Sequence, residues 1–274
     1  MPELPEVETV RRQLAGSLIG TTFTAVEKTE PAMVRDCTAL EVERRVPGRR
    51  ILGIDRLGKF IVVALDGGVF LTLHLGMTGR LLIDPGDGPG PHSRFLFTLE
   101  DDTGRSCRLE FRDPRKFGRL HLTTGGPAPR MRGLGPDAWL GEWDADYLAG
   151  RLRGRRVALK AFLLDQSNLC GIGNIYADEI LWWTGLSPLR PAGALGPDDV
   201  ARLVQEIPTR LGEGVRLLGC TLSDFVDTAG EPGEFQDWLQ AYGRQGQTCT
   251  RCGGVLTRTI VGGRGTAYCP GCQR

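Results

Sequence analysis

Four cysteines near the end of the chain constrain its fold more than any other feature of the sequence. They form two Cys-x2-Cys pairs with sixteen residues between them, Cys249 with Cys252 and Cys269 with Cys272. Two such pairs at this separation are typical of a tetrahedral zinc site with four thiolate ligands. Because four protein ligands leave no open coordination position, we expect one structural Zn²⁺. Two disulfides are the alternative, which a reducing cytoplasm disfavours.

The residues between the two pairs predict a β-hairpin. Glycine pairs at 253–254 and 262–263 form turns on either side of residues 255–261, which is the pattern of a strand between turns. The metal is therefore expected to hold a short hairpin that presents Arg264 at its turn, where the guanidinium can reach a phosphate group.

The opening motif, Met1-Pro2-Glu3-Leu4-Pro5-Glu6-Val7-Glu8, combines a nucleophile with acids. Removal of Met1 would leave the secondary amine of Pro2 as the N-terminus, and α-amino groups titrate near neutrality. Such an amine can attack an aldehyde-level carbon to give a cationic iminium, and the carboxylates of Glu3 and Glu6 lie within reach for proton transfer. The alternative is an ordinary helix start, with a proline and acids in the first turn.

The length and the charge of the chain limit the class of protein to which it can belong. A chain of 274 residues can bury a sizeable core and is expected to split into two domains. No apolar run can span a bilayer, and early charges exclude a signal peptide, so we expect a cytoplasmic protein. The net charge is +1, yet residues 151–160 and 238–274 each hold five basic residues and no acid. Such clusters favour a polyanionic partner, although solvated surface charge explains any single cluster.

Lysine is rare in this sequence. Of 34 basic residues only four are lysine, among them Lys59 and Lys160. Base composition could favour arginine throughout, but a retained lysine can mark a position where a proton must be given up, which arginine does not do. Lys59 and Lys160 are therefore candidates for chemistry.

The stretch up to about residue 123 predicts a β-sandwich with the first helix packed on it. Short runs rich in β-branched, aromatic and leucine residues are separated by hairpin turns at 66–68 and 102–104. The runs are 50–56, 60–65, 69–75, 95–99, 107–111 and 119–123. Residues 86–91, rich in glycine and proline, predict a mobile loop.

Two loops of this region carry further candidates. His74 and Met77 lie at a glycine-rich strand end, and Arg115 and Phe117 lie in the loop Asp113-Pro114-Arg115-Lys116-Phe117-Gly118. Methionine and phenylalanine more often fill cores. If both loops are exposed, however, Met77, Arg115 and Phe117 could enter a base stack and fill a vacated position.

The second half of the chain predicts helices. A glycine- and proline-rich linker at 125–137 marks a domain boundary. Helices are expected at 157–166 and 175–183 and across 198–218, where Pro208 should introduce a kink. The turn Gly171-Ile172-Gly173-Asn174 offers N–H groups to a phosphate at a helix start. Residues 219–236 predict a long flexible loop.

Taken together, these motifs resemble the formamidopyrimidine-DNA glycosylase family. The resemblance runs in order through both domains and the finger. It rests on the opening motif, Gly58-Lys59, His74-Leu75-Gly76-Met77, the Asp113–Gly118 loop, Gly171-Ile172-Gly173-Asn174-Ile175-Tyr176-Ala177, Tyr242-Gly243-Arg244, and Arg264-Gly265-Thr266 followed by Tyr268-Cys269-Pro270.

The resemblance implies an α+β fold in four parts. An N-terminal β-sandwich with a packed N-terminal helix spans 1–124, and a linker spans 125–150. A helix–two-turn–helix domain spans 151–238, and a zinc β-hairpin with four cysteine ligands spans 239–274. The implied activity is that of a bifunctional glycosylase and abasic-site lyase of base excision repair, which removes oxidised purines from duplex DNA. A monomer associated with the nucleoid is expected, with no membrane partner.

The resemblance also implies roles for residues. Pro2 is the Schiff-base nucleophile, Glu3 the acid for glycosidic cleavage, Glu6 a residue that shapes the pocket, and Lys59 a proton donor in β-elimination. Arg264 matches the position assigned to δ-elimination and, because a guanidinium rarely gives up its proton, is better suited to stabilise a leaving phosphate. Positions implied for DNA contact are His74, His92, Arg115, Arg156, Lys160, Asn174 and Tyr242, and those implied for filling the gap of a flipped nucleotide are Met77, Arg115 and Phe117.

Two other functions remain open from the sequence. An endonuclease VIII-type glycosylase for oxidised pyrimidines has the same fold, but Leu4, Met77 and the Arg115/Phe117 pair favour the purine branch. A non-catalytic zinc-ribbon DNA-binding protein would explain the finger and the basic clusters. It would not explain Pro2, Glu3 and Lys59.

Overall fold

A computed structural model describes residues 1–86 and 88–274, so residue 87 of the predicted 86–91 loop lies outside the described residues. The chain forms two compact units. The N-terminal unit comprises Met1–Arg132 and Leu217–Glu234, and the C-terminal unit comprises Gly133–Arg216 and Phe235–Arg274. The segment Leu217–Glu234, which the sequence-based boundaries place in the helical domain, thus packs with the N-terminal unit. Among the described residues, no helix has the length and apolar character needed to cross a bilayer.

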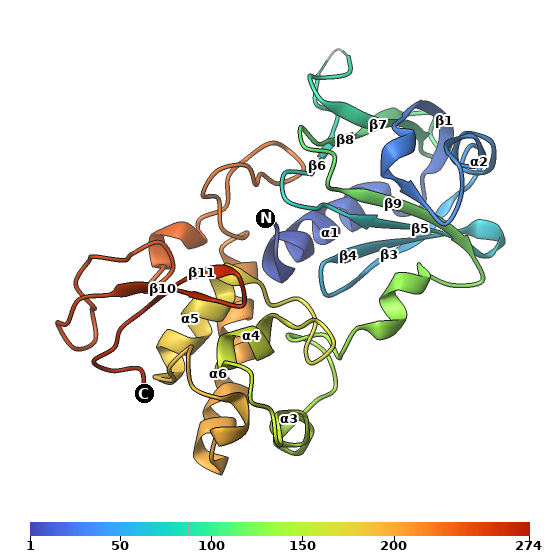
Figure 1. Cartoon of the computed structure of the whole chain (residues 1–274). Helices are drawn as coiled ribbons and strands as arrows, with labels where there is room; N and C mark the ends of the chain where they lie inside the picture. Colours follow the sequence, from blue (N-terminus) through green and yellow to red (C-terminus); the bar gives the residue numbers. More distant parts are fainter. Residues whose placement is uncertain (87) are drawn as a thin grey trace. The chain divides into compact units, whose positions relative to one another are not determined.

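Two sheets form the N-terminal unit (Figure 1). The five-stranded sheet has the order β2-β9-β5-β4-β3, and the four-stranded sheet the order β1-β7-β8-β6. Their neighbouring strands pair antiparallel, except for the parallel pair β2 and β9. The strands are β1 (Thr22–Thr29), β2 (Val34–Arg35), β3 (Ile51–Leu57), β4 (Phe60–Leu65), β5 (Val69–His74), β6 (Arg80–Ile83), β7 (Ser93–Glu100), β8 (Ser106–Arg112) and β9 (Arg119–Thr124).

The core of this unit joins both sheets to the first helix, which confirms the predicted sandwich. Helix α1 (Leu4–Leu18) buries one stripe of apolar side chains because they recur at helical spacing. Phe23 and Phe97 from the four-stranded sheet and Leu73 from the other sheet belong to the same buried cluster. The stripe on α1 consists of Leu4, Val7, Val10, Leu14 and Leu18.

Six predicted strands are confirmed as β3, β4, β5, β7, β8 and β9, but in this unit the sequence interpretation missed three strands and one helix. Strand β1 was missed because polar residues alternate irregularly along it, and two register shifts interrupt its pairing with β7. Helix α2 (Ala39–Arg45) begins with a capping box of Thr38 and Glu41, a recognisable signal that the sequence interpretation did not use.

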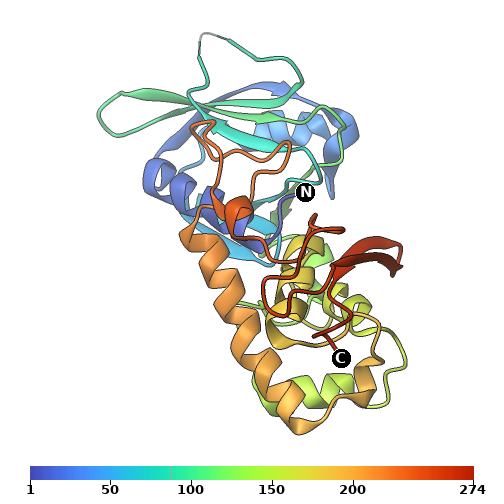
Figure 2. The same ribbon diagram turned by 90° about the vertical axis from the view of Figure 1, so that its left-hand side faces the viewer.

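Helices and one hairpin form the C-terminal unit (Figure 2). Helix α5 is its centre, because nine of its side chains are buried. Helix α6 continues past Pro208 to Arg216, and the kink expected at this proline stays a prediction. Helix α3 was not predicted. The elements are α3 (Ala145–Leu152), α4 (Leu159–Leu164), α5 (Asn174–Thr184), α6 (Pro197–Arg216), β10 (Thr257–Val261) and β11 (Arg264–Tyr268).

Short 3-10 turns complete both units. They are η1 (Pro31–Met33), η2 (Asp66–Gly68), η3 (Pro129–Gly133), η4 (Ala192–Ala194) and η5 (Phe235–Trp238). The turn η2 lies in the predicted hairpin between β4 and β5, and Gly67 and Gly68 both have positive φ there, which glycine adopts without steric cost.

Candidate active site

The opening motif lies at the buried start of α1. Pro2 is buried, and Glu3 and Glu6 are each 1% exposed. The backbone N–H of Glu3 donates to Glu6 Oε2 at 2.7 Å. This bond is one half of a capping box, so the same acids that suggest catalysis also start the helix. The two interpretations of the motif are therefore compatible in this fold.

Glu6 also holds a segment that is distant in sequence. Its Oε1 accepts a hydrogen bond from the backbone N–H of Cys220 at 2.8 Å. Gly219 has φ +86°, and a Cβ at this position would lie 2.9 Å from Glu6 Cγ. The approach requires glycine for both reasons. Because both carboxylate oxygens accept backbone N–H groups, Glu6 is suited to positioning Glu3 and Cys220.

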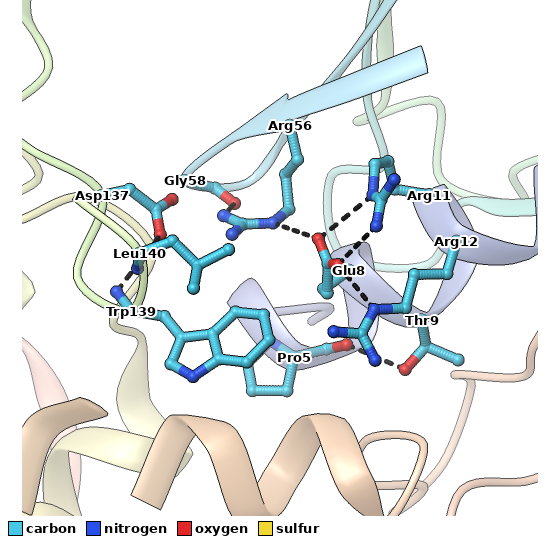
Figure 3. Close-up of polar contacts among 10 residues, drawn as sticks. All are labelled: Pro5, Glu8, Thr9, Arg11, Arg12, Arg56, Gly58, Asp137, Trp139 and Leu140. Carbon is cyan, nitrogen blue, oxygen red and sulfur yellow. Dashed lines mark hydrogen bonds and ion pairs between the residues drawn. The ribbon is translucent and has the colours of Figure 1, made fainter. Parts of the chain in front are cut away.

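A buried cluster of charges connects α1 to the turn that carries Lys59 (Figure 3). Glu8 Oε2 lies 2.9 Å from Arg56 Nε, and their side chains are 4% and 3% exposed. Arg56 Nη1 donates to the carbonyl of Gly58 at 3.0 Å. Glu8 also binds Arg11 and Arg12. Burial alone would raise the pKa of Glu8, but these three arginines hold it below its ordinary value.

Lys59 follows Gly58 in the hairpin turn between β3 and β4 and is partly exposed. The chain Glu8, Arg56, Gly58 therefore connects the helix that begins beside Pro2 to the turn that carries Lys59. Sequence analysis did not find Glu8 and Arg56. In the sequence they are only an acid and an arginine in two elements that are predicted to pack together. Many pairs of residues fit that description, so it does not identify these two.

His74 ends β5 opposite Phe60, and the two rings lie 4.8 Å apart. Burial, together with the nearby cations Lys59 and Arg130, lowers the pKa of His74 to about 4. The ring is therefore neutral at neutral pH. Its Nδ1 accepts from the N–H of Gly76 at 3.1 Å, which leaves the proton on Nε2, where it can be donated to an acceptor such as a phosphate.

Asp113 connects the two loops that carry Met77 and Phe117. This buried carboxylate accepts from Thr78 Oγ1 at 2.5 Å and from the N–H groups of Gly118 at 2.7 Å and Arg115 at 3.2 Å. A Cβ at Gly76 would lie 2.6 Å from the backbone of the second loop. The loops that carry Met77 and Phe117 are therefore in direct contact.

The side chains expected to fill a gap are accessible. Arg115 and Phe117 are exposed, and the Arg115 guanidinium lies 4.5 Å from the centre of the Phe117 ring. Met77 is partly exposed, and His92 is exposed with φ 64° near the same loop, where its carbonyl accepts from the N–H of Asp113. The structure thus brings these residues of the N-terminal unit to one group of loops.

Lys160, which is predicted to contact DNA, is buried. Its side chain is 0% exposed, with Nζ 2.7 Å from Asp178 Oδ1. The ammonium also donates to the carbonyl of Gly265 and to Thr266 Oγ1, at 3.0 and 2.9 Å. This enclosed ammonium does not lie at the surface, so the structure adds no support for a direct phosphate contact, which stays a prediction. Lys160 attaches the finger hairpin, β10 and β11, to α4 and α5.

Other residues predicted to contact DNA also lie in the C-terminal unit. Asn174 Nδ2 donates to the carbonyl of Gly265 at 3.1 Å, beside the exposed Arg264. Arg156 is exposed in the turn between α3 and α4. The structure therefore places Asn174 and Arg264 close together, as neighbours of the hairpin start.

Tyr242 is held by a carboxylate that sequence analysis missed. Glu179 is fully buried on α5 and accepts the N–H groups of Gln240, Ala241 and Tyr242 at 2.8, 2.8 and 2.9 Å. Burial raises the pKa of Glu179 to about 7, and the three hydrogen bonds oppose this rise. Its helix therefore fixes the backbone just before the finger.

The four predicted zinc ligands form one cluster. The Sγ atoms of Cys249, Cys252, Cys269 and Cys272 all lie within 4.8 Å of one another. Zn–S bonds of about 2.3 Å in a tetrahedron place sulfurs about 3.8 Å apart. The separations of 3.8 Å between Cys249 and Cys272 and 3.4 Å between Cys252 and Cys269 fit this geometry. The cluster is a site for one structural zinc ion.

Family models match three parts of the chain. The model described as the formamidopyrimidine-DNA glycosylase N-terminal domain matches residues 1–120, and the formamidopyrimidine-DNA glycosylase H2TH domain matches residues 134–226. A zinc finger found in FPG and IleRS matches residues 246–274.

Individual relatives match over the full length. Formamidopyrimidine-DNA glycosylase of Thermus thermophilus is 44% identical over 100% of this chain and 98% of its own. The crystal structure of the MutM (Fpg) protein from the same species has a TM-score of 0.87 at 43% identity, covering 99% of this chain and 98% of that one.

A second solved structure contains DNA. A variant of Lactococcus lactis Fpg in complex with DNA containing Fapy-dG has a TM-score of 0.90 at 31% identity, with both chains fully covered. Because the matches run from the opening motif to the last cysteine pair, the chain belongs to the formamidopyrimidine-DNA glycosylase family.

Proposed function

We propose that the protein is a bifunctional DNA glycosylase and abasic-site lyase of base excision repair. Its substrates are oxidised purines, 8-oxoguanine and formamidopyrimidines, in duplex DNA. The observation that carries this proposal is the buried opening motif, in which Glu6 fixes the backbone of Glu3 directly after Pro2. The relatives named as formamidopyrimidine-DNA glycosylases and the Fapy-dG complex support the choice of substrate.

The chemistry begins once the damaged nucleotide has left the stack. The uncharged amine of Pro2 attacks C1′ of the sugar. The base leaves with the electron pair of its bond to C1′ and takes up the proton that the Pro2 nitrogen loses, while Glu3 protonates O4′ as the C1′–O4′ bond breaks and the ring opens. The product is a cationic iminium between Pro2 and the sugar carbon.

Strand cleavage follows because the iminium acidifies the neighbouring C2′ hydrogen. Loss of that proton expels the 3′ phosphate in β-elimination, for which Lys59 is the proposed proton donor. A second elimination expels the 5′ phosphate. For this step Arg264, a permanent cation, stabilises the charge on the leaving group without releasing its own proton.

The remaining residues have proposed roles in holding DNA. His74, His92, Arg156, Asn174 and Tyr242 contact the backbone, with the neutral His74 ring donating from Nε2. Met77, Arg115 and Phe117 fill the gap left by the extruded nucleotide. An enzyme with these contacts acts as a monomer on nucleoid DNA in the cytoplasm.

The test compares two duplexes under single-turnover conditions. One contains 8-oxoguanine opposite cytosine, and the other contains thymine glycol. We expect faster base release from the first duplex, and a covalent adduct on either substrate after borohydride reduction. Preference for thymine glycol would instead indicate an endonuclease VIII-type enzyme. Binding without any adduct or base release would indicate a DNA-binding protein without catalysis.

A further inference from the structure

The segment Leu217–Glu234 closes on itself as a loop, which we call the return loop. At its neck the N–H of Glu234 donates to the carbonyl of Leu217 at 2.8 Å. A Cβ on Gly233 would lie 2.3 Å from the carbonyl oxygen of Gly219, so glycine is needed where the two arms meet. Phe225 anchors the middle in the core of the N-terminal unit. A loop with joined ends and its own packing is a compact unit.

The return loop begins at the proposed reaction site. Cys220 donates its N–H to Glu6, whose other oxygen holds the backbone of Glu3. Leu222 is two residues farther along and is 53% exposed. Since each residue spans at most about 3.6 Å, Leu222 lies within about 7 Å of Cys220. A base attached to a sugar at Pro2 would therefore be near this exposed part of the loop.

The other end of that exposed part is held by Gln13 of α1. Gln13 Nε2 donates to Asp227 Oδ2 at 2.7 Å. Its Oε1 accepts from the N–H and the hydroxyl of Thr228, at 2.9 and 3.0 Å. Asp227 and Thr228 are both buried, and the second oxygen of Asp227 accepts the N–H groups of Ala229 and Glu231. The Gln13 amide thus helps to fix a buried turn of the return loop, together with the N–H of Ile83, which donates to the carbonyl of Thr228 at 2.9 Å.

Glu6 and Gln13 act as a pair of anchors. They are seven residues apart, so they face the same side of α1 two turns from each other. Glu6 holds the loop at Cys220, and Gln13 holds it at Asp227 and Thr228. The exposed Leu222 and Ser223 lie between the two anchors. Phe225, which packs in the core between them, is a third attachment, so removing Gln13 would loosen the turn at Asp227 and Thr228 and let the part of the loop before it shift relative to the site.

We propose that Gln13 is a positioning residue that sets which bases the enzyme releases, by fixing the return loop beside the reaction site. The inference rests on the proposed glycosylase function. An abasic site has no base for the loop to contact, so its cleavage should not depend on where the loop lies. Loss of Gln13 should therefore separate base release from abasic-site cleavage.

The variant Gln13→Leu tests this, since it keeps most of the side-chain volume and removes all three hydrogen bonds. On a duplex with 8-oxoguanine opposite cytosine, we expect single-turnover base release to fall about 10-fold or more, as for a misplaced binding group. Cleavage of a preformed abasic site should stay within about 2-fold of the wild type. The second reaction also verifies that the variant is folded.

A matched control is Gln205→Leu, the same change at an exposed position on α6. It should leave both reactions unchanged. If Gln13→Leu slows both reactions to the same extent, Gln13 contributes only to the stability of the fold and the inference is overturned. Unchanged base release in this variant would also overturn it. Failure of the wild type to release the base at all would instead refute the proposed function, so the two failures are distinguishable.

Discussion

In each unit a buried ion pair connects a helix to a turn that carries a residue proposed to act in catalysis. The two pairs differ in the number of cations that contact the carboxylate. In the N-terminal unit, Glu8 of α1 binds Arg56, which also holds the carbonyl of Gly58 before Lys59. In the C-terminal unit, Asp178 of α5 binds Lys160, which also holds Gly265 and Thr266 after Arg264. Both arrangements consist of a carboxylate on a central helix and a cation that fixes the backbone of a turn.

The difference lies in the number of cations. Glu8 has Arg11 and Arg12 as further partners, and Arg12 is half exposed. Lys160 and Asp178 are enclosed, with 0% and 1% side-chain exposure. A buried carboxylate that loses its only cation is left as an uncompensated charge, which lowers the free energy of unfolding. A carboxylate that keeps other cations is not left in this way. The N-terminal unit should therefore tolerate loss of one cation better than the C-terminal unit.

The largest effect is expected for Lys160→Met, which leaves Asp178 buried without its cation. We expect the C-terminal unit to lose about 3–5 kcal/mol of unfolding free energy. Tryptophan fluorescence in urea measures this unit selectively, because all five tryptophans belong to it. The double variant Lys160→Met/Asp178→Asn should recover much of the loss, since no charge remains buried. An unchanged midpoint in the single variant would refute the importance of the pair.

A smaller effect is expected for Arg56→Met, because Glu8 keeps two arginines. The loss should be about 1.5–3 kcal/mol, the value of a hydrogen bond to a charged group. Its main consequence should be kinetic: strand cleavage should slow about 10-fold because the Lys59 turn loosens, while base release changes little. Rates of both steps on one labelled duplex provide the measurement.

Arg12→Met is the matched control for Arg56, since it removes another arginine from Glu8 without touching Gly58. This partly exposed contact should contribute little, and both rates should match those of the wild type. If Arg12→Met and Arg56→Met slow strand cleavage equally, the effect comes from the charge of Glu8 rather than from the turn.

The smallest expected effect concerns His74, beside Lys59 in the N-terminal unit. Its pKa is lowered from 6.5 to about 4, so an unfolded chain binds the proton first as pH falls. The associated stability is complete above about pH 6.5 and is lost as pH falls towards 4. In a proton NMR titration, one of the three histidine rings should stay neutral until about pH 4 and be missing in His74→Gln. Three rings that all titrate near 6.5 would contradict this environment.

Much of this arrangement could be predicted from local sequence. Regular apolar runs predicted six strands, because residues that pack on both sides of a sheet leave a clear pattern. Spacing alone predicted the four thiols, because metal geometry dictates it. The opening motif predicted a helix start with acids in its first turn, although not that these acids are buried. These features depend on residues close together in the chain.

Long-range contacts explain what local sequence could not provide. The hydrogen bond from Cys220 to Glu6 joins residues 214 positions apart. Residues 219–236 are polar and glycine-rich and therefore suggested a flexible loop, yet Phe225 and Gln13 attach this segment to the N-terminal unit. Lys160 was expected to contact DNA, because nothing near it in the sequence reveals its partner Asp178 on another helix. Charge patterns along a chain do not reveal which charges are buried together.

The central claim is that the Pro2 amine forms a transient bond to the sugar, and mass spectrometry of the trapped complex tests it most directly. The protein is incubated with an 8-oxoguanine duplex in borohydride, digested, and the DNA-linked peptide is sequenced. We predict a mature chain without Met1 and a link on the nitrogen of Pro2. A link to Lys59, or full strand cleavage by a chain whose N-terminal amine is blocked, would contradict the account.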